Sequence, residues 1–237
     1  MDERCSIEIT LYRAVLFDMD GVITNTTPLH FEAWKRAFGQ HGIDVQRMDV
    51  YLREGMTSDM MAAEIAREKG KELSKEDMKK IVEYKTKVFN ELVMEQAKAY
   101  DGVPATLGML RNNGIKLALV TGSRRGSVSA VLRKVGLEGA FDIIIGAEDV
   151  TKGKPDPEPY LVAMNKLDIP ALDCVVVENA PPGIRAAKAA KVGFVIAIAS
   201  TLDTSYLQDA DGIHSSFVDL EQCLARQFEA RPGRAIM

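Results

Sequence analysis

The 237-residue chain is poor in cysteine, with three residues at positions 5, 174 and 223. These cysteines are too far apart in the sequence to form a pair of metal ligands, and their odd number argues against a disulfide framework. We therefore expect three reduced thiols, which are typical of cytoplasmic proteins, and predict a cytoplasmic location. Cys174 opens an apolar run and is expected to be a small core residue.

The chain also lacks long apolar segments and blocks of basic residues. No apolar run approaches the ~20 residues of a membrane span, and the first ten residues carry Asp2, Glu3 and Arg4, unlike a signal peptide. The net charge of −4 is not accompanied by a lysine and arginine stripe, so neither a membrane nor a nucleic acid is an expected partner. The negative net charge does not exclude a small anionic substrate, because a local pocket or a metal ion can hold it. We expect a monomer or a small homo-oligomer.

Five short apolar runs, rich in valine and isoleucine, favour buried strands. They are Ala14–Phe17, Leu117–Val120, Ile143–Ile145, Val175–Val177 and Phe194–Ile198. From the second run onward, segments with helical spacing of apolar residues lie between them. This alternation predicts a Rossmann-like α/β fold, a parallel sheet with helices on both faces.

Residues 27–101 interrupt the alternation, because they contain no strand signal. Ile81, Tyr84, Val88 and Leu92 fall on one face of a long helix in this segment. We predict an inserted α-helical cap domain at 27–101 and an α/β core formed by residues 1–26 and 102–237. An insert directly after the first strand would lie above the strand ends, where a lid is useful.

Residues with catalytic potential follow the predicted strands. Ligands of open parallel sheets bind outside the carboxyl ends of the strands, so these residues should meet in one site. The candidates are Asp18, Asp20, Thr121, Gly122, Ser123, Glu148, Asp149, Lys152, Lys154, Glu178 and Asn179. Asp18 and Asp20 indicate a nucleophile and a proton-transfer partner. Taken singly, the two aspartates could also form a turn, and Lys154 could be a surface lysine.

Four motifs in this order resemble those of the haloacid dehalogenase superfamily of phosphohydrolases and phosphomutases. They are Phe17-Asp-Met-Asp-Gly-Val-Ile23, Val120-Thr-Gly-Ser123, Gly153-Lys-Pro-Asp-Pro157, and Val176-Val-Glu-Asn179 followed by Gly183. The helical insert resembles the cap of β-phosphoglucomutase-like members. Because the motifs span most of the chain and each falls at a strand end, their combination is far more specific than any one of them.

The resemblance implies catalytic roles for four residues. Asp18 would attack phosphorus and form an aspartyl-phosphate. Asp20 would protonate the leaving oxygen and later deprotonate the attacking water. Thr121 would hold a phosphate oxygen, and Lys154 would neutralise charge on Asp18 and on the phosphate.

The resemblance also implies a metal ion and further contacts to the phosphate. Mg²⁺ would bind to the Asp18 carboxylate, the backbone carbonyl of Asp20 and the side chains of Glu178 and Asn179. The amides near Gly122 and Ser123 would contact the phosphate. Many family members have a second acidic residue where this chain has Asn179, which brings no negative charge. Alternatively, Asn179 does not contact the metal and forms a hydrogen bond to one of the metal ligands.

The cap loop departs from the β-phosphoglucomutase pattern. Glu54 stands in the place of a lysine, and Ser58 in that of an arginine, which together grip a second phosphate of the sugar. This change favours a phosphatase, in which water attacks the aspartyl-phosphate, over a mutase, which returns the phosphoryl group to a sugar. An acidic cap loop with Glu-Asn in the fourth motif resembles a branch that includes inorganic pyrophosphatases, in which Glu54 would help to hold a metal–pyrophosphate complex. Alternatively, Glu54 forms a surface pair with Arg53 or with another lysine of the cap.

His30 matches a histidine that helps to position Asp20 in β-phosphoglucomutase-like caps, although a packed or solvated histidine is the alternative. Thr26 matches a hinge threonine of the same group. The sequence thus predicts a Mg²⁺-dependent phosphohydrolase for a small phosphorylated metabolite or inorganic pyrophosphate. The alternatives are a β-phosphoglucomutase-type sugar phosphomutase, a carbon–halogen hydrolase and a binding module without activity.

Overall fold

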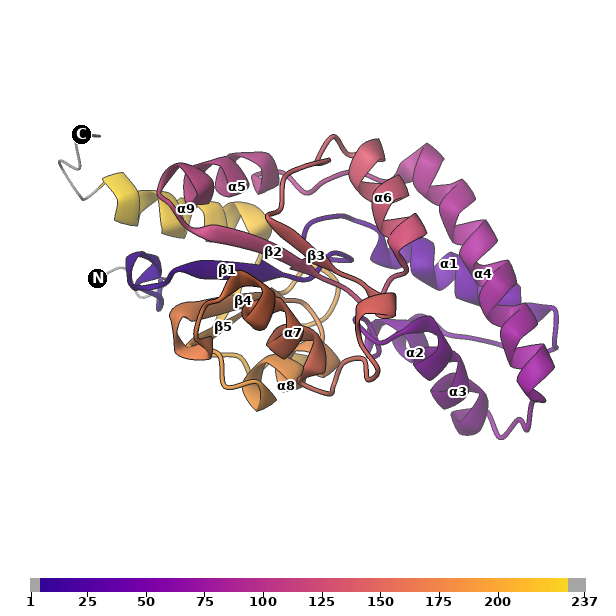
Figure 1. Cartoon of the computed structure of the whole chain (residues 1–237). Coiled ribbons are helices and arrows are strands. Elements are labelled where there is room, and N and C mark those ends of the chain that lie inside the picture. The colour runs from indigo at the N-terminus through magenta and orange to yellow at the C-terminus, as the bar shows by residue number, and fades with distance from the viewer. Residues whose placement is uncertain (1–4, 230–237) are drawn as a thin grey trace.

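The structure is a computed structural model that describes residues 5–229. Within these residues, the chain builds a parallel six-stranded sheet in the order β3-β2-β1-β4-β5-β6 (Figure 1). The strands are β1 (Ala14–Phe17), β2 (Lys116–Val120), β3 (Ile143–Ile145), β4 (Cys174–Glu178), β5 (Phe194–Ile198) and β6 (Gly212–His214). The predicted α/β class is confirmed. The sequence did not predict β6, a short edge strand that begins with glycine.

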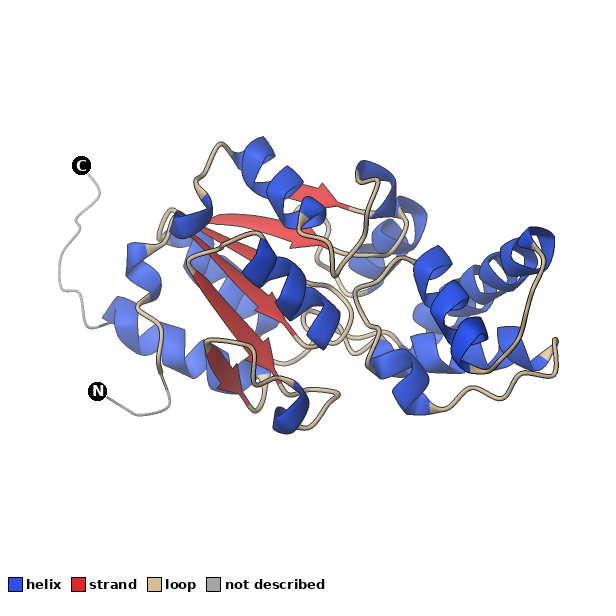
Figure 2. Ribbon diagram, turned by 90° about the horizontal axis from the view of Figure 1, so that it is seen from below, coloured by secondary structure: helices blue, strands red, loops and turns tan. Residues whose placement is uncertain are grey.

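Helices cover both faces of the sheet, as expected (Figure 2). They are α5 (Val103–Asn112), α6 (Arg125–Lys134), α7 (Glu158–Leu167), α8 (Pro181–Ala189) and α9 (Phe217–Glu229). Alternate side chains of β1 enter two different cores, Phe17 with α5, α6 and α9, and Leu16 with α7 and α8. Short 3₁₀ turns occur at η1 (Ile9–Leu11), η2 (Ala147–Asp149), η3 (Ala171–Asp173) and η4 (Thr204–Tyr206).

A bundle of four helices lies beyond the carboxyl ends of the strands (Figures 1 and 2). It consists of α1 (Thr27–Gly39), α2 (Arg47–Tyr51), α3 (Ser58–Glu68) and α4 (Lys75–Gln96). The bundle has an apolar core of its own, built around Trp34, Phe38, Ile65 and Ile81. Its position follows from the sequence, because the segment leaves the central strand β1 at its carboxyl end and returns to the sheet through α5.

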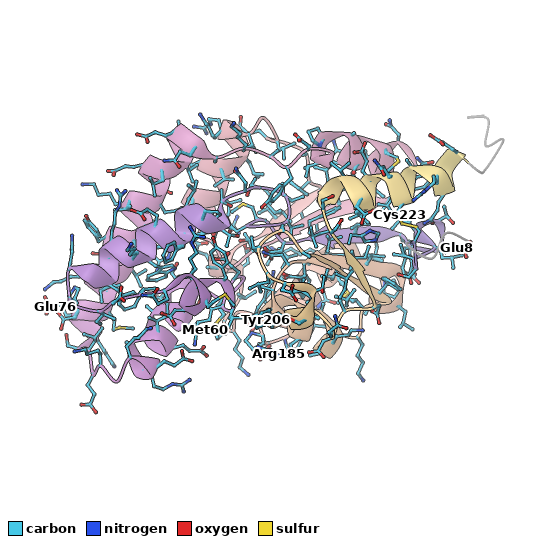
Figure 3. The ribbon with its side chains drawn as sticks, turned by 180° about the vertical axis from the view of Figure 1, so that it is seen from behind. Glu8, Met60, Glu76, Arg185, Tyr206 and Cys223 are labelled. Atoms are coloured by element: carbon cyan, nitrogen blue, oxygen red, sulfur yellow. A yellow bond between two sulfur atoms is a disulfide. The ribbon has the colours of Figure 1, made fainter. Side chains whose placement is uncertain are left out.

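The expectation of three reduced thiols is wrong. Cys5 and Cys223 form a disulfide with a Cα–Cα distance of 5.4 Å, which joins the N-terminal segment to α9 at the end of the molecule away from the bundle (Figure 3). The fold brings together two cysteines that are 218 residues apart, a proximity that an odd count does not exclude. The argument for a cytoplasmic location from reduced thiols therefore fails. Cys174 is free and buried, as expected.

Within residues 5–229, the structure contains no helix of the length and apolarity that a membrane span requires.

We expect no rapidly reacting thiol in the folded, unreduced protein. Two cysteines are in the disulfide, and burial raises the pKa of the Cys174 thiol to about 12, which suppresses its reactive thiolate. Titration with Ellman's reagent should detect one thiol per chain after denaturation and all three after reduction. A Cys174→Ser variant should lose the single unreduced signal. Three reactive thiols in the denatured, unreduced protein would contradict the disulfide.

Candidate active site

Because β1 lies in the middle of the sheet, Asp18 and Asp20, which follow its carboxyl end, are flanked by the ends of neighbouring strands on both sides. β1 is paired with β2 on one side and with β4 on the other, and the amide of Asp18 extends the ladder by donating to the Val177 carbonyl at 3.0 Å. Gly21 then turns the chain with a φ of +85°. A Cβ on Gly21 would lie 2.1 Å from Asn179 Nδ2, so a glycine is needed for this close approach.

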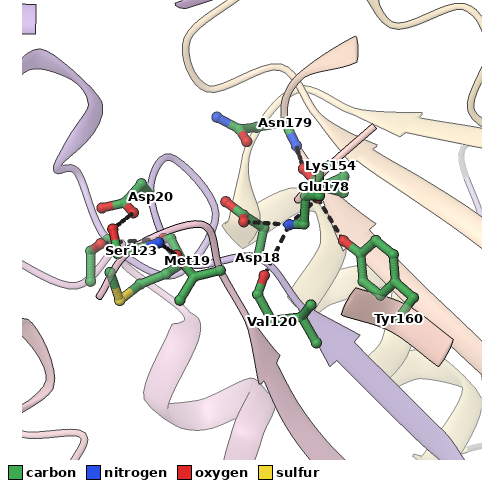
Figure 4. A network of polar contacts seen from close by, with 11 residues as sticks. Asp18, Met19, Asp20, Val120, Ser123, Lys154, Tyr160, Glu178 and Asn179 are labelled. Atoms are coloured by element: carbon green, nitrogen blue, oxygen red, sulfur yellow. Dashed lines mark hydrogen bonds and ion pairs between the residues drawn. The ribbon is translucent and has the colours of Figure 1, made fainter. Parts of the chain in front are cut away.

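The buried side chain of Lys154 donates hydrogen bonds to groups at the carboxyl ends of β1, β2 and β4 (Figure 4). Lys154 Nζ donates to Asp18 Oδ1 at 2.6 Å, to Glu178 Oε1 at 2.6 Å and to the Val120 carbonyl at 2.9 Å. The side chains of Lys154, Asp18 and Glu178 are each at most 1% exposed. The hydroxyl of Tyr160 donates to the same Glu178 oxygen at 2.6 Å. The sequence predicted the lysine and both carboxylates but not the tyrosine.

Burial dominates the electrostatics of this cluster. It raises the pKa of Asp18 to about 8, although the nearby Lys154 opposes this shift. Burial also acts to lower the pKa of Lys154, but the attraction of Asp18 and Glu178 outweighs it and raises that pKa. Burial and Glu178 raise the pKa of Tyr160 well above its usual value. The lysine is therefore charged and the tyrosine is a neutral hydrogen-bond donor.

Asp20 lies in a separate set of hydrogen bonds. Its Oδ1 accepts from Thr26 Oγ1 at 2.5 Å and lies 3.1 Å from His30 Nε2, and its Oδ2 accepts from Ser123 Oγ at 3.2 Å. Burial acts to raise the pKa of Asp20, but His30 and the hydrogen bonds from His30 and Thr26 lower it on balance. The two aspartates thus have pKa values shifted in opposite directions.

Behind Asp20, the bundle contributes a second buried lysine. Lys85 Nζ lies 2.8 Å from His30 Nδ1 and 5.0 Å from the ring centroids of both Trp34 and Phe89. An ammonium group only donates, so Nδ1 accepts and the proton of His30 resides on Nε2, facing Asp20. Burial and Lys85 lower the pKa of His30, which favours the neutral ring, and burial lowers the pKa of Lys85 to about 8.

The sequence did not predict Lys85. It falls on the apolar face of α4, four residues after Ile81 and three before Val88, and a lysine inside such a stripe is the signal that could have identified it. His30 and Asp20, which were predicted, do lie together.

Glu54 is buried, with only 2% of its surface exposed, and its Oε1 has no hydrogen-bond partner in the described part of the chain. Burial and the charges of Asp20 and Asp18 raise its pKa well above the usual value. Arg53 faces the other way and forms ion pairs with Glu64 and with Glu68. Because Glu54 is buried, the alternative of a surface pair with Arg53 or another cap lysine is wrong.

The loop that follows α2, residues 52–58, packs against the strand ends and is called the cap loop below. A small cavity of about 20 Å³ lies between the bundle and the strand ends, lined by Asp20, His30, Trp34, Glu54, Gly55, Met56, Ser58, Met61, Lys85, Thr121, Gly122 and Ser123. A space of this size holds about one water molecule. Gly122 lies so close to the loop that a Cβ on it would be 2.3 Å from the Met56 carbonyl oxygen. All predicted substrate contacts, His30, Glu54, Gly122 and Ser123, line this cavity.

The predicted metal ligands fit a hard divalent cation. Asp18 Oδ2 and Asn179 Oδ1 are buried oxygens without a hydrogen-bond partner among the described residues. The Asn179 amide nitrogen donates to Thr201 Oγ1 at 3.2 Å, which leaves the amide oxygen for another contact. Glu178 already accepts hydrogen bonds on both oxygens. Within residues 5–229, no group of three His, Cys, Asp or Glu side chains could hold a metal, so a site here would draw on the amide and a backbone carbonyl.

Two carboxylates after β3 lie outside this cluster. Glu148 accepts from the Arg125 amide at 3.1 Å, and Asp149 accepts from the Gly146 amide at 2.9 Å and from the Arg125 guanidinium at 2.5 Å. They join the turn after β3 to Arg125, the first residue of α6.

Comparison with known proteins gives consistent matches. A family model described as haloacid dehalogenase-like hydrolase matches residues 12–191. The chain is 36% identical over 196 residues to a phosphorylated carbohydrates phosphatase of Thermotoga maritima, covering 80% of this chain and 87% of the relative. It is 31% identical over 182 residues to a β-phosphoglucomutase of Bacillus subtilis, covering 75% and 80%. A solved putative β-phosphoglucomutase of Bacteroides vulgatus has a TM-score of 0.82 and 31% identity, covering 94% and 91%.

We expect a Gly122→Ala substitution to push the cap loop away from the strand ends, because the new Cβ would overlap the Met56 carbonyl. Hydrogen–deuterium exchange in residues 52–58 should accelerate by about tenfold or more as this contact opens. Gly126→Ala is the matched control, since a Cβ at position 126 in α6 meets nothing within 4 Å. Equal exchange of the loop in both variants would show that Gly122 does not seat it.

Proposed function

This chain belongs to the haloacid dehalogenase-like hydrolase family, and on that premise we propose that it is a Mg²⁺-dependent phosphatase. It acts on small phosphorylated metabolites, sugar phosphates among them, through an aspartyl-phosphate on Asp18. One observation carries the proposal. Asp18 lies in a buried ion cluster with Lys154 and Glu178, while Asp20, two residues later, lies in a separate hydrogen-bonded set at the same strand end. The phosphatase relatives support the same chemistry.

In the first step, an Asp18 oxygen attacks phosphorus, and the bond from phosphorus to the leaving oxygen breaks. Lys154 offsets the charge that accumulates on Asp18 and on the phosphoryl oxygens. Thr121 and the backbone at Gly122 and Ser123, which line the cavity, contact the phosphoryl oxygens.

Asp20 carries the proton in both steps. It donates to the leaving oxygen and then accepts a proton from the water that attacks the aspartyl-phosphate. Its lowered pKa suits the second role. The first role requires a higher pKa, which an adjacent phosphate dianion provides by repulsion. His30 and Thr26, which hydrogen-bond to the same Asp20 oxygen, hold the carboxyl in position for both transfers.

Asp18, the backbone carbonyl of Asp20, Glu178 and Asn179 would hold the Mg²⁺. When bound, this cation neutralises the phosphate and keeps Asp18 ionised, against the burial that raises the pKa of this carboxyl. The two buried oxygens without partners, Asp18 Oδ2 and Asn179 Oδ1, support this assignment.

Residues 27–101 act as a cap over this site. A cavity of about 20 Å³ does not admit a metabolite, so the cap must move for substrate to enter. Polar contacts across the boundary include an exposed pair of Arg124 with Asp59 at 3.2 Å and a part-buried hydrogen bond from Ser127 Oγ to Asn90 Oδ1 at 3.0 Å. The buried pair of His30 with Asp20 at 3.1 Å also crosses it, so opening of the cap would separate His30 from the proton-transfer residue.

Hydrolysis is favoured over the mutase reaction. A mutase holds a second phosphate of the sugar and returns the phosphoryl group to it, which requires a cation in the cap. Glu54 stands at the position of the family's lysine, and Arg53 is committed to Glu64 and Glu68. Lys85, a basic residue of the bundle that lines the cavity, is held 2.8 Å from His30 Nδ1. Pyrophosphate is a second candidate substrate, because a metal–pyrophosphate complex would place a cation beside the buried Glu54 carboxyl.

We expect Asp18→Asn to lower the rate of phosphate release from sugar phosphates by about a thousandfold or more, because an amide is a poor nucleophile. Asp209→Asn, at an exposed turn, should retain wild-type activity. EDTA should abolish wild-type activity, and added Mg²⁺ should restore it. An undiminished rate in Asp18→Asn would refute the assignment, and activity that persists after EDTA treatment would refute the metal dependence.

Incubation with β-glucose 1-phosphate distinguishes hydrolysis from the mutase reaction. We expect free phosphate and glucose, because the cap provides no clamp for the bisphosphate that a mutase retains. Glucose 6-phosphate, measured with its dehydrogenase, should stay at the level of an Asp18→Asn control. Its accumulation at a rate above phosphate release would identify a mutase.

A further inference from the structure

The side-chain amide of Asn179 is held by a hydrogen bond at one end only. Its Nδ2 donates to Thr201 Oγ1 at 3.2 Å, whereas its Oδ1 is buried and has no hydrogen-bond partner among the described residues. Asn179 is fully buried, so bulk water does not reach that oxygen. The proposed function assigns this oxygen to the Mg²⁺ ion, and the orientation of the amide therefore decides which atom the ion would meet.

Only one end of an amide can bind a cation. The carbonyl oxygen is an acceptor, whereas the NH₂ group carries two donors and no acceptor. An Asn179 amide turned by 180° would direct hydrogens at the ion instead of an oxygen. An aspartate would not have this requirement, since both ends of a carboxylate are oxygens. A site that uses Asn179 therefore needs an acceptor for Nδ2.

Thr201 supplies this acceptor from a fixed position in the loop after β5. On one side of it, Ser200 Oγ donates to the Gly21 carbonyl at 2.5 Å, at the turn that follows Asp20. On the other side, Leu202 is buried in the apolar core that α7 and α8 cover. The hydroxyl of Thr201 is thus anchored to the same turn against which the Asn179 amide packs.

We propose that Thr201 is a positioning residue for the metal site. Its hydroxyl accepts from Asn179 Nδ2 and thereby leaves Asn179 Oδ1 available to the cation. A cation draws electron density from the amide oxygen, which strengthens the N–H donor and its bond to Thr201. The inference rests on the proposed function, because it presupposes the metal site, and it adds a residue that lies outside the four sequence motifs.

The test measures binding of Mn²⁺, a paramagnetic substitute for Mg²⁺, to the metal-free full-length chain. The electron paramagnetic resonance signal of free Mn²⁺ gives its Kd without turnover, and competition gives the Kd of Mg²⁺. Thr201→Val keeps the shape but removes the acceptor, and should raise both Kd values by about tenfold or more, the usual cost of losing a partner of a metal ligand.

Two further variants are controls for the loop. Thr201→Ser keeps the hydroxyl and should remain within about threefold of the wild-type Kd. Thr204→Val makes the same exchange three residues later, at an exposed position of η4, and should not change the Kd. A Kd that is unchanged in Thr201→Val, or raised as much in Thr204→Val, would overturn the proposal.

An Asn179→Asp background separates orientation from packing. Because both ends of the aspartate are oxygens, no partner is needed to choose between them. Thr201→Val should therefore change the Kd by less than about twofold in this background, although it acts about tenfold on the wild type. A role of Thr201 in loop packing alone would give the same loss in both backgrounds and would contradict the proposal.

Asp18→Asn shows which site is titrated. We expect the wild type to bind a cation whose Kd rises in this variant. If no such binding is found, the proposed metal site is refuted, and with it the Mg²⁺-dependent function. Binding that depends on Asp18 but not on the Thr201 hydroxyl would refute only the positioning role.

Discussion

The contact of Lys154 with Asp18 and Glu178 is the constraint on which the site depends. One ammonium group ties the ends of β1 and β4 to the Val120 carbonyl at the end of β2, and all three side chains are almost fully buried. Buried charges are tolerated only when they are paired and hydrogen-bonded, so the loop that carries Lys154 must reach the strand ends for the fold to be stable. The same requirement places the proposed nucleophile beside a fixed positive charge.

Much of the site could be predicted because a parallel sheet converts order along the chain into proximity. Asp18, Lys154 and Glu178 are more than a hundred residues apart at the extremes. Asp18 follows β1, Lys154 lies in the loop after β3 and Glu178 ends β4, and strands of one direction end at one edge. The short strand β6 offers no such signal, since three residues show no periodicity. The spacing of Phe217, Leu220 and Leu224 is helical, so α9 was predictable although the sequence prediction omitted it.

The sequence could not predict contacts between side chains that are distant along the chain and become neighbours only in the folded structure. Tyr160 has the spacing of an ordinary core residue on α7, and nothing in the sequence indicates that its hydroxyl meets Glu178. The Cys5–Cys223 disulfide similarly depends on α9 returning to the N-terminal segment. In the cap, the sequence identified Glu54 by comparison with a motif, but its burial and the turn of Arg53 toward Glu64 follow from how α2 and α3 pack.

Charge balance connects the cap to the catalytic edge. Asp18, Asp20, Glu54 and Glu178 are buried together with two lysines, Lys85 and Lys154, so the ionised groups would carry an excess of two negative charges. A protein interior does not retain such an excess, and protons or a cation must offset it. Burial raises the pKa values of Asp18 and Glu54, the carboxyls that would take up those protons. One divalent cation would supply the same charge. In the proposed mechanism, closing the loop that carries Glu54 would add one of these negative charges, and a cation at the strand ends would then favour closure. The acidic residue of the loop would couple cap position to metal binding.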